Sequence, residues 1–287
     1  MQRIPLLLPA IVLALLLSPC GFAQTGKVLE NVPYKTGDSL SQPERERCRL
    51  DLYLPSGRGR DFPTLVWFHG GGLTGGSKDD ETSKKIARRL AREGIAVAVP
   101  NYRLSPGATF PSYIEDAAAA VAWVHTHIAE HGGDPAKLFV GGHSAGGYLT
   151  SMVGMDLRYL QNAGVDPANV IGLIPMSGQM VTHFTVKKER GIGEHTIIAD
   201  EAAPIHFTRK ETPPFLIIFG DRDWPGRLEE NQYFAAAQRA AGNENVTILV
   251  VNDRDHNSIA DRTGDAGDPA GKAIVDFIRR HSVPRTR

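Results

Sequence analysis

The feature that most constrains the fold of this chain is a regular alternation of short apolar runs with longer helical patterns. Each short run stops at glycine, proline or another turn residue, as strands buried on both faces do. The stretches between them place apolar residues three or four positions apart, which is typical of helices packed on one face. Strands that alternate with helices predict a mostly parallel central sheet with helices on both of its faces.

The predicted elements follow one another from residue 47 onward. The expected strands are 47–54, 65–68, 95–99, 138–140, 171–176, 215–219 and 246–251, and the expected helices are 81–93, 112–130, 146–157, 228–241 and 270–280. The first strand alternates apolar and polar residues, which predicts half burial, whereas the other runs are continuously apolar. The irregular segment 179–212 predicts a small insertion over the carboxyl edge of the sheet, where ligands bind in this architecture.

The charge balance and the cysteine content narrow the possible partners and the redox chemistry. The 287 residues include 32 Lys and Arg against 32 Asp and Glu, so the formal net charge is zero. A balanced charge without a basic, aromatic-rich stretch argues against a nucleic-acid partner or an anionic membrane surface. Cys48 lies in an alternating stretch, where we expect its thiol to pack as a small apolar side chain.

The N-terminus has the pattern of a secretory signal. Arg3 precedes a nearly continuous apolar stretch at 6–17, and small residues follow before position 24. We expect residues 1–23 to be a cleaved signal peptide, because the apolar stretch is too short to span a membrane. The mature chain would then be secreted or periplasmic. A lipid anchor on Cys20 is the less favoured alternative.

A glycine-rich turn with a central serine stands directly between an apolar strand and a helix. The run GHSAG at 142–146 matches the G-x-S-x-G pattern in that setting. A sharp strand-to-helix turn holds the serine in a strained conformation with its hydroxyl exposed, and small flanking residues let the backbone bend back on itself. An ordinary glycine-rich turn is the alternative, but the flanking strand and helix favour Ser144 as a nucleophile.

A second glycine cluster, HGGG at 69–72, follows another apolar strand. Acyl transfer develops negative charge on the carbonyl oxygen, and backbone N–H groups reach that oxygen best where no side chain intervenes. We therefore assign Gly71 and Gly72 as oxyanion-hole donors, together with the N–H of Ala145 after the nucleophile. We expect His69 to hold this loop in place. A merely flexible glycine loop is the alternative.

The other members of a catalytic triad follow later in the chain. Two aspartates end one buried strand, and His256 directly follows the last predicted strand. Ser144, Asp223 and His256 therefore occur in the order nucleophile, acid, base that this kind of sheet uses. His256 would take the proton of Ser144, and Asp223 would orient the imidazole. Asp221 competes for the role of the acid, whereas we expect Asp255 to stabilise its own loop.

Several neighbours of these residues are candidates for shaping the site. Trp224 follows the expected acid and either lines the pocket or packs as an ordinary aromatic side chain. Met176, Ser177 and Met180 lie at a strand end that faces the site, where they are candidates to shape an acyl pocket. We expect Tyr148, just past the nucleophile, to serve packing.

Five runs together carry a resemblance to a known superfamily: HGGG at 69–72, NYRLSP at 101–106, GGDPAKLFVGGHSAGG at 132–147, GDRD at 220–223 and DRDH at 253–256. They resemble the α/β-hydrolase superfamily. Within it they are similar to the carboxylesterase branch related to hormone-sensitive lipase and to bacterial feruloyl and acetyl-xylan-type esterases. Kynurenine formamidases look similar too. The resemblance implies one catalytic domain of the α/β-hydrolase fold over 24–287, and it favours Asp223 as the acid. The hormone-sensitive-lipase branch usually has a long helical cap before its first strands, whereas only about two dozen residues separate the expected signal from the first strand here, which favours a small insertion near 179–212 rather than a large cap.

These features predict a serine hydrolase that cleaves carboxylic esters through an acyl-enzyme on Ser144, without a metal or organic cofactor. The expected substrate is a small-molecule or polysaccharide-linked ester, with no nucleic acid and no stable membrane span involved. Two alternatives stay open, namely amide hydrolysis of the arylformamidase type and a non-catalytic binding protein on the same fold. The residues do not distinguish the acyl group, the alcohol or the oligomeric state.

Overall fold

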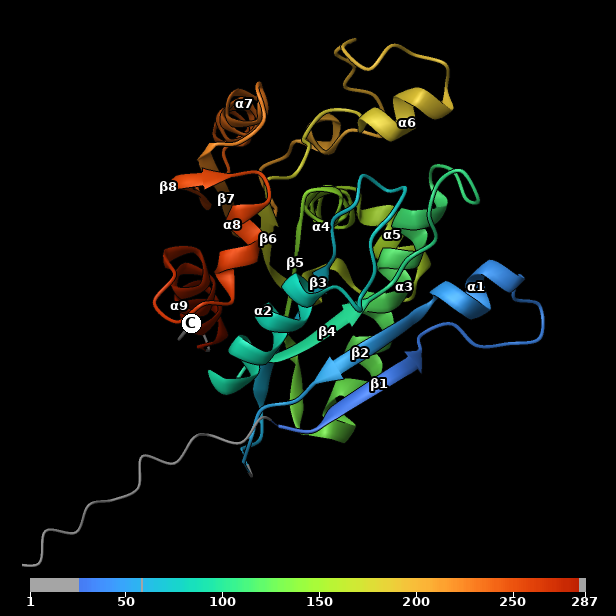
Figure 1. Cartoon of the computed structure of the whole chain (residues 1–287), viewed down its shortest axis with the longest axis vertical. Coiled ribbons are helices and arrows are strands. Elements are labelled where there is room, and N and C mark those ends of the chain that lie inside the picture. Colours follow the sequence, from blue (N-terminus) through green and yellow to red (C-terminus); the bar gives the residue numbers. More distant parts are fainter. Residues whose placement is uncertain (1–25, 58, 284–287) are drawn as a thin grey trace, which may run out of the picture.

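A computed structural model describes residues 26–57 and 59–283 of the chain (Figure 1). Its strands are β1 (Val28–Pro33), β2 (Arg49–Tyr53), β3 (Phe62–Phe68), β4 (Ala96–Pro100), β5 (Gly133–His143), β6 (Val170–Met176), β7 (Phe215–Arg222) and β8 (Val246–Asp255). Within the described ranges they form one sheet in the order β1-β2-β4-β3-β5-β6-β7-β8. β2 runs antiparallel to β1 and β4, and all other pairs are parallel. The predicted mostly parallel sheet is confirmed.

Helices cover both faces of the sheet, as the alternation predicts. They are α1 (Gln42–Arg47), α2 (Glu81–Arg92), α3 (Ser112–His127), α4 (Ala145–Met155), α5 (Leu157–Asn162), α6 (Phe184–Glu189), α7 (Arg227–Ala240), α8 (Ser258–Thr263) and α9 (Pro269–Ser282), with short 3-10 turns η1 (Ile128–His131), η2 (Pro167–Asn169) and η3 (Pro204–Phe207). In Figure 1, α2, α8 and α9 lie on one side of the sheet, and α3, α4 and α5 lie on the other. Successive side chains of a strand point to opposite faces. Leu65 and Trp67 therefore pack with the first group of helices, and Val66 and Phe68 with the second.

The burial of β2 differs from the expected half burial. Leu50, Asp51, Leu52 and Tyr53 are all buried. The carboxylate of Asp51 lies 3.0 Å from the Lys78 ammonium, which is itself buried. The prediction of half burial was wrong, because Asp51, the polar residue of the alternating pattern, forms an internal ion pair instead of facing water.

The last predicted strand also differs from the expectation for a continuously apolar run. β8 is the terminal strand of the sheet, next to β7. Val246 and Val251 are buried, but the side chain of Val250 is 40% exposed. Burial on both faces was the wrong prediction here, because β8 is the edge strand of the sheet.

The predicted insertion between two strands is confirmed. Residues 177–214 connect β6 to β7 and contain α6 and η3. Figure 1 shows α6, in yellow, extending beyond the edge of the sheet at which the parallel strands end. The insertion is anchored to the main body, because the Tyr148 hydroxyl of α4 donates to the Ala202 carbonyl at 2.8 Å. The Thr185 hydroxyl also donates to the carbonyl of Gly72.

The predicted signal segment 1–23, including Cys20, lies outside the described residues. Among the residues that are described, no helix is both long enough and apolar enough to cross a bilayer. Cys48 is buried and carries a free thiol, as its expected packing role requires.

Candidate active site

Five parallel strands end at one edge of the sheet, and each delivers a residue of interest to that edge. His69 follows β3, Ser144 follows β5 and Ser177 follows β6. Asp223 follows β7 and His256 follows β8. Because these strands are neighbours in the sheet, their ends bring together residues that lie far apart in the sequence.

Ser144 occupies the strained turn that the sequence predicts. Its backbone has φ +55° and ψ −114°, which is an unfavourable region for a residue with a Cβ. The turn is crowded, because a Cβ on Gly146 would lie 2.1 Å from the carbonyl oxygen of Phe68. A Cβ on Gly142 would lie 2.6 Å from the backbone of Gly146. The glycines therefore permit the close approach that lifts the serine out of the strand.

The three predicted triad residues form a continuous hydrogen-bonded chain. The Ser144 hydroxyl oxygen lies 2.9 Å from Nε2 of His256, and Nδ1 of His256 lies 2.7 Å from Oδ1 of Asp223. A carboxylate only accepts hydrogen bonds, so Nδ1 carries the proton and Nε2 is free to accept the serine proton. The side chains of His256 and Asp223 are 4% and 2% exposed, which shields this arrangement from water.

The surroundings of Asp223 keep its carboxylate ionised. Oδ2 accepts a 2.5 Å hydrogen bond from the Ser177 hydroxyl, and Oδ1 also accepts the backbone N–H of Trp224 at 2.7 Å. Burial raises the pKa of Asp223, but the hydrogen bonds from His256 and Ser177 outweigh it, so the pKa is lowered overall. The competing Asp221 is exposed and instead accepts the backbone N–H of Arg254 at 3.1 Å.

Ser177 and His143 are two contributors to this geometry that the sequence patterns do not identify. Ser177 was expected to shape an acyl pocket, yet its hydroxyl contacts the acid. His143 donates from Nε2 to the backbone carbonyl of His256 at 2.7 Å and so holds the loop that carries the base. Burial, assisted by the neighbouring His256, lowers the pKa of His143 to about 4, so this side chain is neutral at neutral pH. The sequence signal that could have identified Ser177 and His143 is their position, because both residues lie at strand ends beside the triad.

The glycine loop after β3 is held through its carbonyl groups and its histidine. The carbonyl of Gly71 accepts the N–H groups of Thr74 and Gly75. The buried His69 ring stacks on Tyr102 with centroids 4.4 Å apart and donates to the Gly70 carbonyl at 2.7 Å. These contacts agree with the expected structural role of His69.

The three predicted oxyanion donors belong to the glycine loop after β3 and to the first residue of α4. Gly71 and Gly72 have φ values of +113° and +63°, conformations that favour glycine. A Cβ on Gly70 would lie 3.4 Å from the Cβ of Ser144, which places this loop against the nucleophile. Ala145 is the first residue of α4, so its N–H has no partner within the helix.

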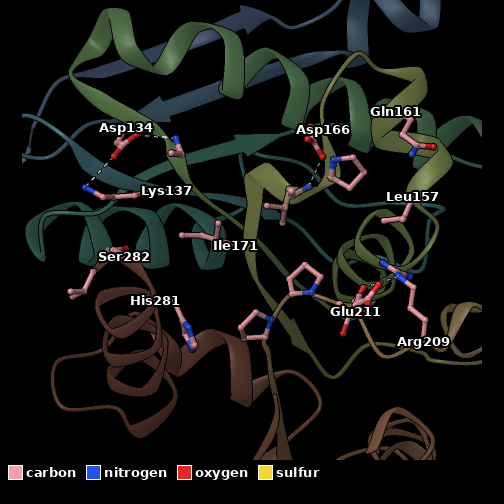
Figure 2. Close-up of a pocket in the computed structure, with 18 residues that line it drawn as sticks. Asp134, Lys137, Leu157, Gln161, Asp166, Ile171, Arg209, Glu211, His281 and Ser282 are labelled. Carbon is pink, nitrogen blue, oxygen red and sulfur yellow. Dashed lines mark hydrogen bonds and ion pairs between the residues drawn. The ribbon is translucent and has the colours of Figure 1, made fainter. Parts of the chain in front are cut away.

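A hollow of about 320 Å³ lies beside the glycine loop. It is lined by Gly70, Gly71 and His143, by Asn257 and Asp261 near α8, and by residues around the start of α2. A larger hollow of about 760 Å³ lies where β5 and β6 begin and is shown in Figure 2. Asp134 there pairs with Lys137 at 3.1 Å. Because parallel strands begin and end at opposite edges, the larger hollow is remote from Ser144.

The sheet order and the strained serine together define the class of this protein. A parallel sheet with a serine at the turn from β5 into α4, followed in the chain by an acid after β7 and a histidine after β8, is the α/β-hydrolase fold. The chain belongs to the BD-FAE family, whose model matches residues 50–236. The matched region runs from β2 into α7.

The chain is similar to curated esterases over part of their length. Esterase LipQ of Mycobacterium tuberculosis is 29% identical over 216 residues, which are 69% of this chain and 51% of that protein. Esterase LipC of the same organism is 28% identical over 256 residues, which are 80% of this chain and 62% of that protein. The chain thus spans only about half to three fifths of the length of these relatives.

Solved structures share the fold over nearly the whole described chain. A truncated carbohydrate esterase from gut microbiota has a TM-score of 0.73 at 23% identity, covering 91% of this chain and 98% of that one. Esterase 2 of Thermogutta terrifontis with bound propionate has a TM-score of 0.67 at 21% identity, covering 91% and 94%. At these identities the similarity establishes the fold.

Proposed function

We propose that the chain is a serine hydrolase that cleaves carboxylic esters. The observation that carries this proposal is the unbroken hydrogen-bonded chain from Ser144 through His256 to Asp223. The family membership and the names of its relatives, which are esterases, support the choice of an ester as substrate.

The first half of the proposed reaction transfers the acyl group to the enzyme. The Ser144 oxygen forms a bond to the ester carbonyl carbon while its proton moves to Nε2 of His256. The bond between that carbon and the alcohol oxygen then breaks, and the proton on Nε2 passes to the departing alcohol oxygen. Asp223 keeps the imidazole oriented and stabilises its positive charge.

The second half of the reaction returns the enzyme to its starting state. Water gives a proton to Nε2 of His256 and its oxygen bonds to the acyl carbon. The bond from that carbon to Ser144 breaks, and the proton on Nε2 returns to the serine oxygen. The products are a carboxylic acid and the free hydroxyl of Ser144.

Gly71, Gly72 and Ala145 are the proposed donors to the oxyanion that develops in both halves. Their N–H groups belong to the glycine loop and to the start of α4, which flank Ser144. Removing one such donor typically lowers kcat by about 10²–10³-fold.

The proposed setting of the enzyme is outside the cytoplasm. The N-terminal pattern supports a cleaved secretory signal at 1–23, followed by one catalytic domain at 24–287. A secreted enzyme fits small-molecule or polysaccharide-linked esters better than a cytosolic formamide metabolite. N-terminal sequencing of the exported protein tests this: a first residue at position 24 is expected, and an uncleaved or lipid-modified N-terminus would contradict it.

The substrate class is tested by comparing one acyl series with one amide. Purified enzyme should hydrolyse members of an acetyl, butyryl, octanoyl and feruloyl ester series, and the Ser144→Ala variant should show only background rates. N-formylkynurenine serves as the competing amide. A kcat/KM that is clearly higher for the formamide than for every ester would replace the esterase proposal by the arylformamidase alternative. Binding without turnover of any substrate would favour the non-catalytic alternative.

A further inference from the structure

Trp224 lies directly on the proposed catalytic histidine. Its ring stacks on the His256 ring with the centroids 3.6 Å apart and the planes 15° apart. Trp224 is 48% exposed although it is a large apolar side chain, whereas His256 beneath it is 3% exposed. One face of the indole is therefore covered by the histidine, and the exposed area belongs to the other face and the edges.

The main chain of Trp224 is anchored by hydrogen bonds of its backbone N–H and carbonyl, and the stack on His256 holds the indole itself. The backbone N–H of Trp224 donates to Asp223 Oδ1 at 2.7 Å, and the backbone carbonyl of Trp224 accepts the N–H of Arg227 at the start of α7. Exposing a rigid aromatic face has no packing benefit for the folded chain itself. A preorganised face of this kind loses little freedom when a ligand stacks on it, which favours binding.

The chemistry of acylation identifies which part of a substrate meets this face. The bond from the acyl carbon to the alcohol oxygen breaks while Nε2 of His256 delivers its proton to that oxygen. The alcohol group must therefore lie beside His256 at that moment. A side chain that covers the histidine ring is thus next to the alcohol, while the acyl group stays on Ser144.

We propose that Trp224 forms the alcohol subsite and that it binds a six-membered ring, either an aryl group or a pyranose, by stacking. This inference rests on the proposed esterase function. A flat ring places a whole face on the indole, whether it offers π electrons or the C–H groups of a sugar, and a short alkyl chain covers much less of it. The enzyme should accordingly favour esters of ring alcohols over esters of small alkyl alcohols.

The test keeps the acyl group constant and varies the alcohol. The substrates are phenyl acetate, an O-acetylated methyl xyloside and ethyl acetate, all of which form the same acetyl-enzyme. Because kcat/KM reports the steps up to acylation, Trp224→Ala should lower the ratio of ring ester to ethyl ester roughly 3- to 10-fold. Trp224→Phe should retain most of the ratio. Tyr233→Ala, which removes another exposed aromatic, is the control and should leave the ratio unchanged.

Each outcome of this test has one meaning. A fall in the ratio for phenyl acetate, for the xyloside or for both supports the subsite and identifies its ligand. An unchanged ratio, whether all three esters are hydrolysed equally more slowly or none is affected, overturns the inference while leaving the esterase proposal intact. Absence of Ser144-dependent turnover in the wild type removes both. Titration of active enzyme with a fluorophosphonate corrects for misfolded variant. If Trp224→Ala does not fold, Trp224→Leu, which keeps an apolar side chain but removes the flat ring, takes its place in the comparison.

Discussion

Asp221 and Asp223 are separated by one residue, yet their environments give them different chemistry. Asp223 is almost fully buried and accepts hydrogen bonds from His256, from Ser177 and from the backbone of Trp224. Asp221 is exposed and accepts a hydrogen bond from the backbone N–H of Arg254 in β8. The acid is therefore selected by which carboxylate reaches the imidazole, and both aspartates remain ionised at neutral pH because their pKa values are lowered.

Replacing each aspartate by asparagine should separate their roles. Asp223→Asn removes the acceptor that fixes the imidazole tautomer, so we expect kcat to fall by about 10³–10⁴-fold. Asp221→Asn is the matched control and should stay within about twofold of the wild type, because the side chain is exposed and remote from the proton transfer. Similar losses in the two variants, measured with one activated ester, would contradict the assignment of the acid.

Ser177 should behave as a positioning residue for the acid. Ser177→Ala removes the hydroxyl that donates to Asp223, and we expect about a tenfold loss in kcat. Without this hydrogen bond the Asp223 carboxylate offers more of its charge to the imidazolium of His256, so the acid-side fall of kcat/KM should move to higher pH.

Ser177→Gly separates this effect from folding. Glycine accepts the backbone φ of +51° at this position without strain, so stability should be kept while the hydroxyl is lost. A Ser177→Gly enzyme with wild-type kcat and an unchanged pH profile would show that the hydrogen bond has no role in catalysis.

At the scale of single residues, the sequence allowed the triad to be predicted but not the residues that hold it in place. Ser144, Asp223 and His256 each stand directly after a recognisable strand, and their chain order is characteristic of the fold. Ser177 and His143 act through partners that lie far away in the sequence, and a single serine or histidine carries no local pattern. Only the assembled sheet edge reveals these contacts.

Among the structural elements, the turn between β5 and α4 has little tolerance for change. The backbone of Gly146 passes so close to β3 that an added Cβ would lie 2.1 Å from the Phe68 carbonyl oxygen. That oxygen belongs to the sheet, so neither partner can move without disturbing the strand pairing. The geometry of the nucleophile therefore depends on the packing of a helix start against a neighbouring strand.

Gly146→Ala should consequently damage both stability and activity. We expect the free energy of unfolding to fall by about 3 kcal/mol, because the clash involves backbone on both sides. Gly59→Ala is the control, since a Cβ there meets no atom within 4 Å and should change stability by less than about 0.5 kcal/mol. Urea unfolding measures both variants. A Gly146→Ala protein with the wild-type midpoint would contradict the described turn.

The strands and helices with the clearest apolar pattern in the sequence were the ones that could be predicted. The continuously apolar runs and the periodic helices identified β3 to β7 and α2, α3, α4, α7 and α9. β1, α1, α5, α6 and α8 were missed, because β1 is a partly exposed edge strand of mixed composition and each of these helices is only six residues long. The burial of β2 and β8 was misjudged because it depends on tertiary partners, namely the Lys78 ion pair and the position at the sheet edge.

Over the whole molecule, several buried histidines make the fold sensitive to acid. Burial lowers the pKa of His69 and of His143 to about 4, and it lowers that of His183 well below its usual value. In the unfolded chain these side chains bind protons near their ordinary pKa of 6.5. The unfolded state then binds more protons than the folded state, so the free energy of unfolding falls as the pH drops from about 6.5 to about 4.

The contribution of one histidine to the slope of the free energy of unfolding against pH can be measured. His143→Gln removes the titrating group while an amide can still donate to the His256 carbonyl, so the slope should become shallower by up to about 1.4 kcal/mol per pH unit. His195→Asn, which replaces a histidine whose side chain is 97% exposed, should leave the slope unchanged. Urea unfolding at pH 7, 6, 5 and 4.5 measures it. A wild-type free energy of unfolding that is constant across this range would contradict the burial of these histidines as neutral groups.

The central claim is that Ser144 is a nucleophile activated by His256, and covalent labelling tests it most directly. The folded wild-type protein should react with a fluorophosphonate in a one-to-one ratio, and mass spectrometry of the digested product should place the adduct on Ser144. Ser144→Ala should fold with the same circular dichroism spectrum and take up no label. No reaction of the folded wild type, or equal labelling of the Ser144→Ala variant, would contradict the account.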